Sequence, residues 1–130
     1  TIIAVAGAPS VTLRLQWSVN GPILSPEDYD LGTIRPPGHV TALSWTALSD
    51  QDTTMSAALG IMRATSVEGA LGAAEAYVAP SQMLTLADRS GIGMALIGAM
   101  PARDPRHQSQ GRMPTFGYIP ENRWQGTLPY

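Results

Sequence analysis

The residues near the amino end that could do chemistry are one hydroxyl and one acidic cluster. Thr1 could act as a nucleophile with its own α-amine as the base. No oxyanion donor stands near it, so we favour the interpretation that it is simply the first residue. Glu27, Asp28 and Asp30 lie close enough in the sequence to bind calcium. An EF-type loop needs more oxygen ligands at set spacings, so a solvated acidic loop explains this cluster better.

The second half of the sequence holds a further group of charged and imidazole side chains. Arg103 and Arg106 could bind a carboxylate ligand, but Asp104 lies between them, and ion pairing inside the loop is the simpler interpretation. His39 and His107 stand far apart and lack the spacing of metal ligands. No phosphate-binding glycine loop, nucleophile elbow or zinc-protease motif occurs. The sequence therefore contains no complete catalytic centre.

The composition excludes several classes of function. None of the 130 residues is lysine or cysteine, which rules out lysine nucleophiles, thiol catalysis and disulfides within them. The net charge of −2 argues against nucleic acid binding, and no run of about 18 apolar residues predicts a membrane span. Charged residues make up only 14%, where a free-standing domain has about 25%. We therefore expect one piece of a larger protein that buries surface against other parts.

The elements that would position these residues centre on a hairpin predicted over residues 80–103. Residues 83–87 and 92–98 are short apolar runs, and residues 88–91 between them have the composition of a tight turn. Both faces of each run are largely apolar, which predicts a sheet covered on both sides.

Two helices are predicted before the hairpin, within residues 52–79. The first follows from apolar residues at helical spacing from Met55 onwards, and the second from a capping box of Thr65 and Glu68. Alanines at 57, 58, 70, 73 and 74 should let these helices pack closely. Pro80 should end the second helix.

The flanking segments are predicted to be less regular. Residues 1–48 should form strands and a loop, with residues 11–19 alternating as a half-buried strand. Residues 39–47 form another candidate strand. Residues 104–130 should form a long irregular loop, rich in arginine and aromatic residues, of the kind that wraps a larger body or lines a site. The predicted class is α/β (α+β), mainly antiparallel, with two adjacent helices and this C-terminal loop.

Several short motifs stand in order across nearly the whole chain, at residues 20–24, 43–47, 80–82, 87–93, 98–103, 111–114 and 124–129. Together they resemble the middle of the large β-subunit of the penicillin acylase (penicillin amidase) family. The resemblance implies an N-terminal nucleophile hydrolase of αββα fold, made as a precursor that cuts itself into two subunits. A new amino-terminal serine would attack an amide of a penicillin, a cephalosporin side chain or an acyl-homoserine lactone. It also implies a periplasmic or secreted protein.

Little of the family's active site transfers to this chain by residue. The catalytic serine and the asparagine oxyanion donor would lie outside residues 1–130, so no catalytic residue is assigned and the chain alone should be inactive. Trp45 falls where the family places an aromatic residue of the acyl pocket, and Gln82 lies near another pocket position. A structural role is an even alternative for Trp45 and the favoured interpretation for Gln82. Gly111 lies near a carbonyl that helps to hold a structural calcium ion in some members, although the chemistry needs no cofactor.

The resemblance also implies partners. These are the α-subunit and the rest of the β-subunit, together with a small-molecule amide substrate. Without them the chain should expose apolar surface and self-associate. A second hypothesis is a non-enzymatic binding or structural module that uses the arginine- and aromatic-rich tail as its contact surface.

Overall fold

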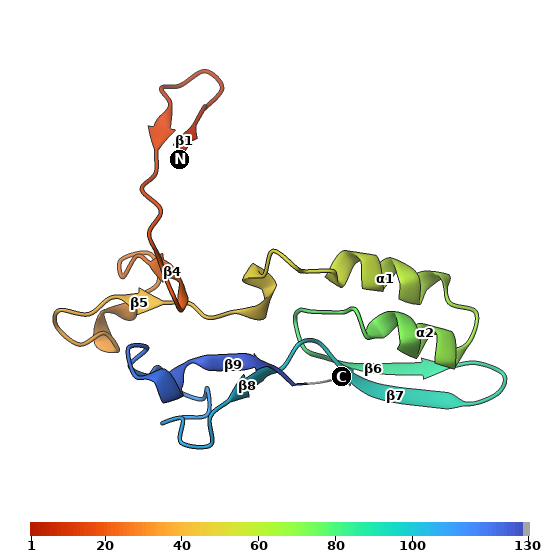
Figure 1. Ribbon diagram of the computed structural model, residues 1–130. Helices are drawn as coiled ribbons and strands as arrows, with labels where there is room; N and C mark the ends of the chain where they lie inside the picture. Colours follow the sequence, from red (N-terminus) through yellow and green to blue (C-terminus); the bar gives the residue numbers. More distant parts are fainter. Residues whose placement is uncertain (129–130) are drawn as a thin grey trace. The chain divides into compact units, whose positions relative to one another are not determined.

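The computed structural model describes residues 1–128; Pro129 and Tyr130, which belong to the last motif and the predicted tail, lie outside this range. The chain divides into two compact units, residues 1–44 and residues 45–130. Helices occur with antiparallel strands, which confirms the predicted α+β class (Figure 1). None of the helices in the described part is long and apolar enough to cross a bilayer.

The first unit is a set of short antiparallel strands in two small sheets. One sheet pairs β1 with β2, and the other has β4 between β3 and β5. Their bounds are β1 (Ile2–Ile3), β2 (Val11–Thr12), β3 (Trp17–Ser18), β4 (Gly21–Leu24) and β5 (Thr41–Ala42). A 3-10 turn, η1 (Leu31–Thr33), lies in the loop between β4 and β5.

Two strand predictions for this unit are wrong in extent. Residues 13–16 separate β2 from β3, so residues 11–19 are not one half-buried strand. Leu15 and Trp17 are exposed, because no second layer within the unit covers the alternating apolar positions. The strand predicted over residues 39–47 shrinks to β5, and η2 (Thr46–Leu48) follows it.

Gly21 explains why one motif contains the sequence Asn-Gly-Pro. Its φ is +114°, and a Cβ there would lie 2.0 Å from the Leu43 carbonyl oxygen. Only glycine fits such a backbone in that space. The Ser44 hydroxyl donates to the Asn20 carbonyl oxygen at 2.6 Å. Leu43 and Ser44, the start of the motif at residues 43–47, therefore lie beside the motif at residues 20–24.

The second unit begins with two helices and a hairpin. α1 (Thr54–Arg63) packs on α2 (Val67–Ala74), and α2 packs on β6 (Gln82–Ala87) and β7 (Ile92–Ile97), as Figure 1 shows. β6 and β7 are antiparallel, with Gln82 opposite Ile97 and Ala87 opposite Ile92. Hairpin and helices therefore form where the apolar runs and helical spacing predict them.

The contacts between helices depend on small side chains, as predicted. Ala57, Ala70 and Ala74 are buried, and a Cβ at Gly60 would lie 2.9 Å from the Ala73 Cβ. A Cβ at Gly93 of β7 would lie 2.4 Å from Cγ1 of Val67 in α2. Because these elements are closely packed, moving either helix away from its neighbour would open a void.

The cap of α2 lies one residue later than predicted. The N-cap is Ser66, whose Oγ accepts from the Gly69 N–H at 3.1 Å. Asp88 of the hairpin turn adds a second acceptor, since its Oδ2 takes the Val67 N–H at 2.9 Å. The amino end of α2 is therefore satisfied from two places.

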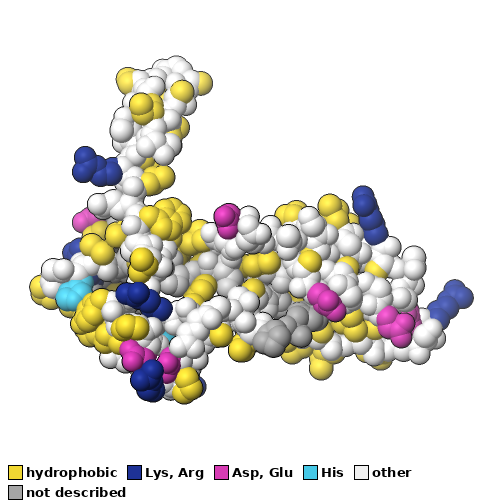
Figure 2. Space-filling view, in the orientation of Figure 1, with side chains coloured by type: hydrophobic (Ala, Val, Ile, Leu, Met, Phe, Trp, Pro, Cys, Tyr) yellow, Lys and Arg dark blue, Asp and Glu magenta, His cyan; other side chains and the backbone are white. Residues whose placement is uncertain are grey.

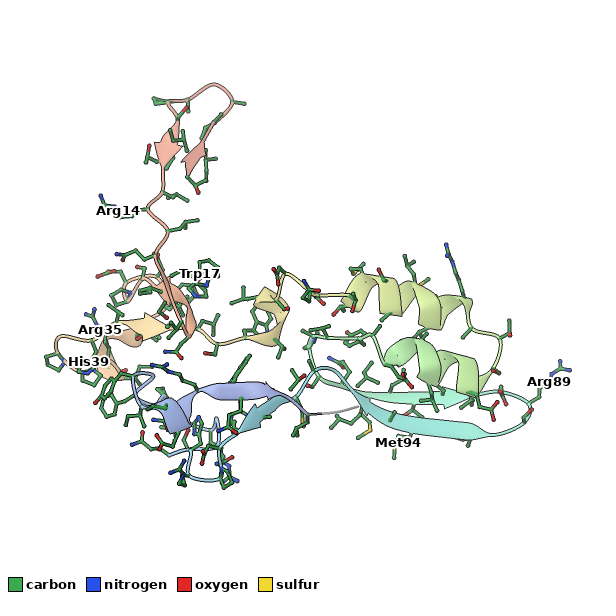
Figure 3. All side chains as sticks on the ribbon, in the orientation of Figure 1. Arg14, Trp17, Arg35, His39, Arg89 and Met94 are labelled. Carbon is green, nitrogen blue, oxygen red and sulfur yellow. The ribbon has the colours of Figure 1, made fainter. Side chains whose placement is uncertain are left out.

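Only one face of the hairpin is covered within the described residues. Ile97 on the helix side is buried, whereas Met94 on the other side is 68% exposed and points away from α2 (Figure 3). Met83, Ile92 and Leu96 share this open face and are exposed as well. Figure 2 shows patches of exposed hydrophobic side chains on the visible surface. The sequence predicted a sheet covered on both faces, but residues 1–128 cover only one face of the hairpin.

The tail is more ordered than an irregular loop. β8 (Pro101–Arg103) pairs antiparallel with β9 (Trp124–Thr127), and η3 (Pro120–Asn122) precedes β9. The prediction of an extended loop over residues 104–130 is wrong for β9. Its partner strand lies more than twenty residues earlier, so no local sequence pattern predicts that β8 and β9 pair. We call residues 103–125, the loop together with its flanking strand residues, the loop network.

Candidate functional site

The buried polar side chains of the described residues gather in the loop network. They are Asp104, His107 and Asn122, each with no more than 9% of its surface exposed. Buried polar groups need hydrogen-bond partners, so the partners of these three side chains show how the loop network is held together. Gly111, the predicted metal-site residue, lies in the same segment.

Asp104 is the charged centre of the loop network. Its Oδ1 accepts from the Arg106 backbone N–H at 2.8 Å and from Nε at 3.1 Å, and its Oδ2 accepts from Arg106 Nη2 at 3.0 Å. Gln125 Nε2 donates to the same Oδ2 at 3.2 Å. The side chain and then the backbone N–H of Arg106 lower the pKa of Asp104 from 3.8 to about 2. The predicted ion pair is confirmed, and its cation is Arg106.

His107 closes a turn of the loop network. Its Nδ1 accepts from the backbone N–H groups of Ser109 and Gln110, at 3.1 and 3.0 Å. With Nδ1 as the acceptor, the ring proton of a neutral imidazole sits on Nε2. Gln110 has a φ of +53°, and its Nε2 donates to the Asp104 carbonyl oxygen at 2.9 Å. These bonds hold the backbone around Gly111.

Asn122 joins the two ends of the loop. Its Oδ1 accepts from the Gln108 N–H at 3.0 Å, and its Nδ2 donates to Gln108 Oε1 at 2.8 Å and to the Phe116 carbonyl oxygen at 3.1 Å. A single amide therefore satisfies groups from 6 and 14 residues away. Sequence reasoning missed Asn122, because no motif or spacing distinguishes this amide from an exposed one.

Gly111 lies against the guanidinium group of Arg103. Its φ is +81°, and a Cβ there would lie 2.6 Å from Arg103 Nη2, 2.7 Å from Cζ and 2.9 Å from Nε. Only glycine permits both this backbone angle and this approach. What the structure places beside Gly111 is thus a cation.

The calcium prediction needs oxygens that these residues do not supply. Calcium takes six to eight oxygen ligands. In residues 1–128 no three His, Cys, Asp or Glu side chains gather as a metal-holding group. Gly111 would contribute one carbonyl, so the described residues alone do not make a calcium site. Its role as a ligand stays a prediction that depends on oxygens from elsewhere.

The two predicted substrate-binding residues lie apart from the loop network in the sequence. Trp45 directly precedes η2 and is 51% exposed. Gln82 is the first residue of β6 and is exposed. Across residues 1–128, no hydrogen bond joins the side chain of either residue to the other or to Gly111. Both side chains are open to contact, and their roles stay predictions.

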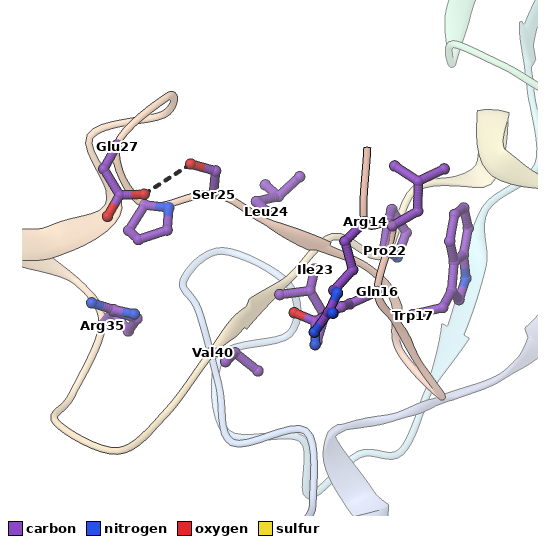
Figure 4. A pocket seen from close by; sticks show the side chains of 12 residues that line it. Arg14, Gln16, Trp17, Pro22, Ile23, Leu24, Ser25, Glu27, Arg35 and Val40 are labelled. Carbon is purple, nitrogen blue, oxygen red and sulfur yellow. Dashed lines mark hydrogen bonds between the residues drawn. The ribbon is translucent and has the colours of Figure 1, made fainter. Parts of the chain in front are cut away.

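The first unit contains a hollow that sequence reasoning missed. It has a volume of about 410 Å³ and is lined by β3, β4 and the neighbouring loops, including Arg14, Trp17, Arg35 and Val40 (Figure 4). Glu27 lies at its edge, where its Oε2 accepts from the Ser25 hydroxyl at 2.9 Å. The alternating pattern of residues 11–19 hid the hollow, because it suggested a covered strand.

Thr1 is held by the backbone in this unit. Its amine donates to the Leu13 carbonyl oxygen at 2.9 Å, and its carbonyl oxygen accepts from the Leu13 N–H at 2.8 Å. A catalytic base would instead accept a proton from the threonine hydroxyl. The geometry therefore fits the structural interpretation of Thr1.

Fold and site together define an α+β chain in which a helix-covered hairpin and a hydrogen-bonded loop are the organised parts. A search of curated proteins finds no match for the chain. The model of the penicillin amidase family matches residues 1–130, the whole chain. The chain therefore belongs to the penicillin amidase family, as its motifs predicted. The match supports an amidohydrolase-type segment.

Proposed function

We propose that residues 1–130 are a scaffold and pocket segment of an enzyme that cleaves an acyl amide bond. The catalytic amino-terminal serine, exposed by self-cleavage of a precursor, would lie outside this segment. The observation that carries the proposal is the family match over the whole chain. The enzyme would have the αββα fold and reside in the periplasm or outside the cell.

The buried polar groups suit a scaffold better than a catalytic centre. Asp104, His107 and Asn122 bond to neighbouring backbone and side-chain groups of the same loop. A nucleophilic hydrolase needs a nucleophile within hydrogen-bond reach of a base, with donors aimed at the developing oxyanion. The loop network instead holds a long segment in one shape, and this is a supporting role.

The open face of the hairpin suits burial against the rest of the enzyme. Burial of apolar surface contributes about 25 cal/mol per Å², so four exposed aliphatic side chains on one sheet face favour association. Those side chains are Met83, Ile92, Met94 and Leu96. We propose that other segments of the same enzyme cover them.

The substrate would carry an acyl side chain of the penicillin, cephalosporin or acyl-homoserine lactone type. Trp45 is half exposed and offers an apolar ring to such a group, and the Gln82 amide is exposed near the start of the hairpin. A tryptophan suits this task because it buries a large area with few rotatable bonds. Gly111 would add one carbonyl to a structural calcium ion, which takes no part in the chemistry.

The proposal is tested on the protein extended along its reading frame on both sides of residues 1–130. Hydrolysis of a chromogenic phenylacetyl amide is measured, and mass spectrometry identifies the new amino terminus. We expect turnover and an amino-terminal serine. Trp45→Ala should raise KM about tenfold, as expected for about 1.4 kcal/mol of lost pocket contact. Trp17→Ala, the matched exposed tryptophan, should leave KM unchanged. An extended protein without self-cleavage and without turnover would refute the proposal.

A further inference from the structure

Arg103 is a cation without a matching anion among the described residues. Both ion pairs there belong to Arg106, with Asp104 and with Glu121. Arg103 Nη1 reaches the Pro101 carbonyl oxygen only at 3.5 Å. Its Nε is buried and has no hydrogen-bond acceptor. A guanidinium group has five donors, so this side chain is left with most of its bonding capacity unused.

The guanidinium group is nevertheless held in place. Arg103 ends β8, where it pairs with Trp124 of β9. A Cβ at Gly111 would lie at nearly equal distances from Nη2, Cζ and Nε, so the guanidinium group occupies the space beside this glycine that a side chain would take. His107 and Gln110 hold that backbone through the turn described above. An arginine held this way loses less rotamer entropy when it binds a ligand.

The nearest carboxylate in the sequence cannot neutralise Arg103. Asp104 has both oxygens engaged, one with Arg106 and the other with Arg106 and Gln125. Arg112, next to Gly111 in the sequence, forms no ion pair in the described residues, so it adds a second cation to the segment. Arg103 and Arg112 therefore have no ion-pair partner among the described residues.

We propose that Arg103, packed on Gly111, is a binding site for a carboxylate. The two oxygens of a carboxylate match the planar fork of Nη1 and Nη2 and can accept two parallel hydrogen bonds. Arg103 is only half-buried; Nη2 makes no hydrogen bond within the described residues and, unlike Nε, is not fully buried, while Nη1 makes only the long bond to the Pro101 carbonyl oxygen. Two sources share this chemistry: a free small acid, and an Asp or Glu side chain of another protein segment.

The site is tested by NMR on the ¹⁵N-labelled 130-residue chain. The Nε–Hε signal of Arg103 is followed during titration with sodium acetate, with sodium chloride at equal ionic strength and acetamide as controls. We expect a saturating shift with half-saturation at millimolar acetate and no shift with either control. A blocked glutamate, N-acetylglutamate α-amide, then separates the sources. Saturation at tenfold lower concentration than acetate assigns the side-chain source, and equal or weaker binding assigns the free acid.

Variants sharpen the same measurement. Arg103→Gln should abolish the acetate response of neighbouring amides, and Arg103→Lys, which keeps the charge but loses the fork, should weaken binding about tenfold. Gly111→Ala should also weaken it, because the added Cβ displaces the guanidinium group. Arg89→Gln, an exposed arginine at the tip of the hairpin (Figure 3), is the matched control and should change nothing.

Three results would overturn the site. They are a linear shift equal at Arg89 and Arg103, the same response to chloride, and acetate binding that survives Arg103→Gln. The Gln108 and Ser109 amides, bonded to Asn122 and His107, report whether a variant keeps its fold. The Arg103 signal of the unmodified chain answers the question even where a variant does not fold.

Discussion

The helix-covered hairpin and the loop network use different side chains for the same task of holding backbone in place. α2 lies on β6 and β7 through alanine, glycine and branched aliphatic contacts, with Gly93 against Val67. The loop network has one short pair of strands and holds the rest of its backbone with side-chain amides, a carboxylate and an imidazole. Close packing stabilises the first region and hydrogen bonding the second.

The comparison teaches where each region is vulnerable. A packed interface tolerates polar changes on its open side but not added volume on its closed side. A hydrogen-bonded loop tolerates little loss of a bonding group, since each removed side chain strands several partners. The following predictions use this contrast, from the largest expected effect on stability to the smallest.

The largest effect is expected at the closed face of the hairpin. Gly93→Ala places a methyl group 2.4 Å from Val67 Cγ1, which forces a stiff side chain and the amino end of α2 to shift. We expect a loss of about 3 kcal/mol in the free energy of unfolding, measured in urea. Gly91→Ala, with nothing within 4 Å of the added Cβ, is the control and should be near neutral. Equal losses for both would refute close packing.

The next effect is expected at the centre of the loop network. Asn122→Ala strands the Gln108 N–H and the Gln108 side chain, and it removes one of the donors to the Phe116 carbonyl, which still accepts from the Ile119 N–H. We expect a loss of about 2 kcal/mol, since each unsatisfied buried group costs about 1–3 kcal/mol. Gln51→Ala removes an exposed amide and should have little effect. If Asn122→Ala were equally harmless, the loop network would not hold the loop.

A smaller effect, dependent on pH, is expected at Asp104. Its pKa in the folded chain is about 2, below its usual 3.8, so folding favours the ionised form. The stabilisation is fully present above about pH 4 and is lost as pH falls towards 2. Denaturant unfolding between pH 6 and 2 should show this loss, and Asp104→Asn should remove that part of the pH dependence. Asp50→Asn should keep it, and parallel curves for all three would contradict the assignment.

The smallest effect on stability is expected at the open face of the hairpin. Met94→Ser changes a 68% exposed side chain, so the free energy of unfolding should change by no more than about 0.5 kcal/mol. Self-association of the chain, measured by sedimentation, should fall because the open face loses apolar surface. Met113→Ser, an equally exposed methionine of the loop network, should affect association less. A monomeric unmodified chain would show that the open face drives no association.

Sequence patterns predicted the packed region because its residues repeat at regular spacing. Apolar runs and a turn composition gave β6 and β7, and helical spacing gave α1 and α2. The cap moved from Thr65 to Ser66 because adjacent hydroxyl residues both suit that position. The exposure of the open face was not predicted, because composition shows that a side chain is apolar but not what covers it.

The loop network was less predictable because its bonds join residues without periodicity. The motif Arg103-Asp104-Pro105-Arg106 predicted an ion pair, but only the structure showed that Arg106 takes Asp104 and leaves Arg103. The pairing of β9 with β8 and the bonds of Asn122 also span long separations. The family resemblance drew attention to Gly111, but only the structure showed that Gly111 contacts Arg103.

The central claim, that this chain is a supporting segment of a penicillin amidase family hydrolase, is tested most directly by an activity assay. Hydrolysis of a chromogenic phenylacetyl amide is compared between the 130-residue chain and the protein extended along its reading frame. The account predicts no turnover by the chain and turnover by the extended protein. Turnover by the chain that survives Thr1→Ala would contradict the account, and turnover lost on Thr1→Ala would make Thr1 the nucleophile.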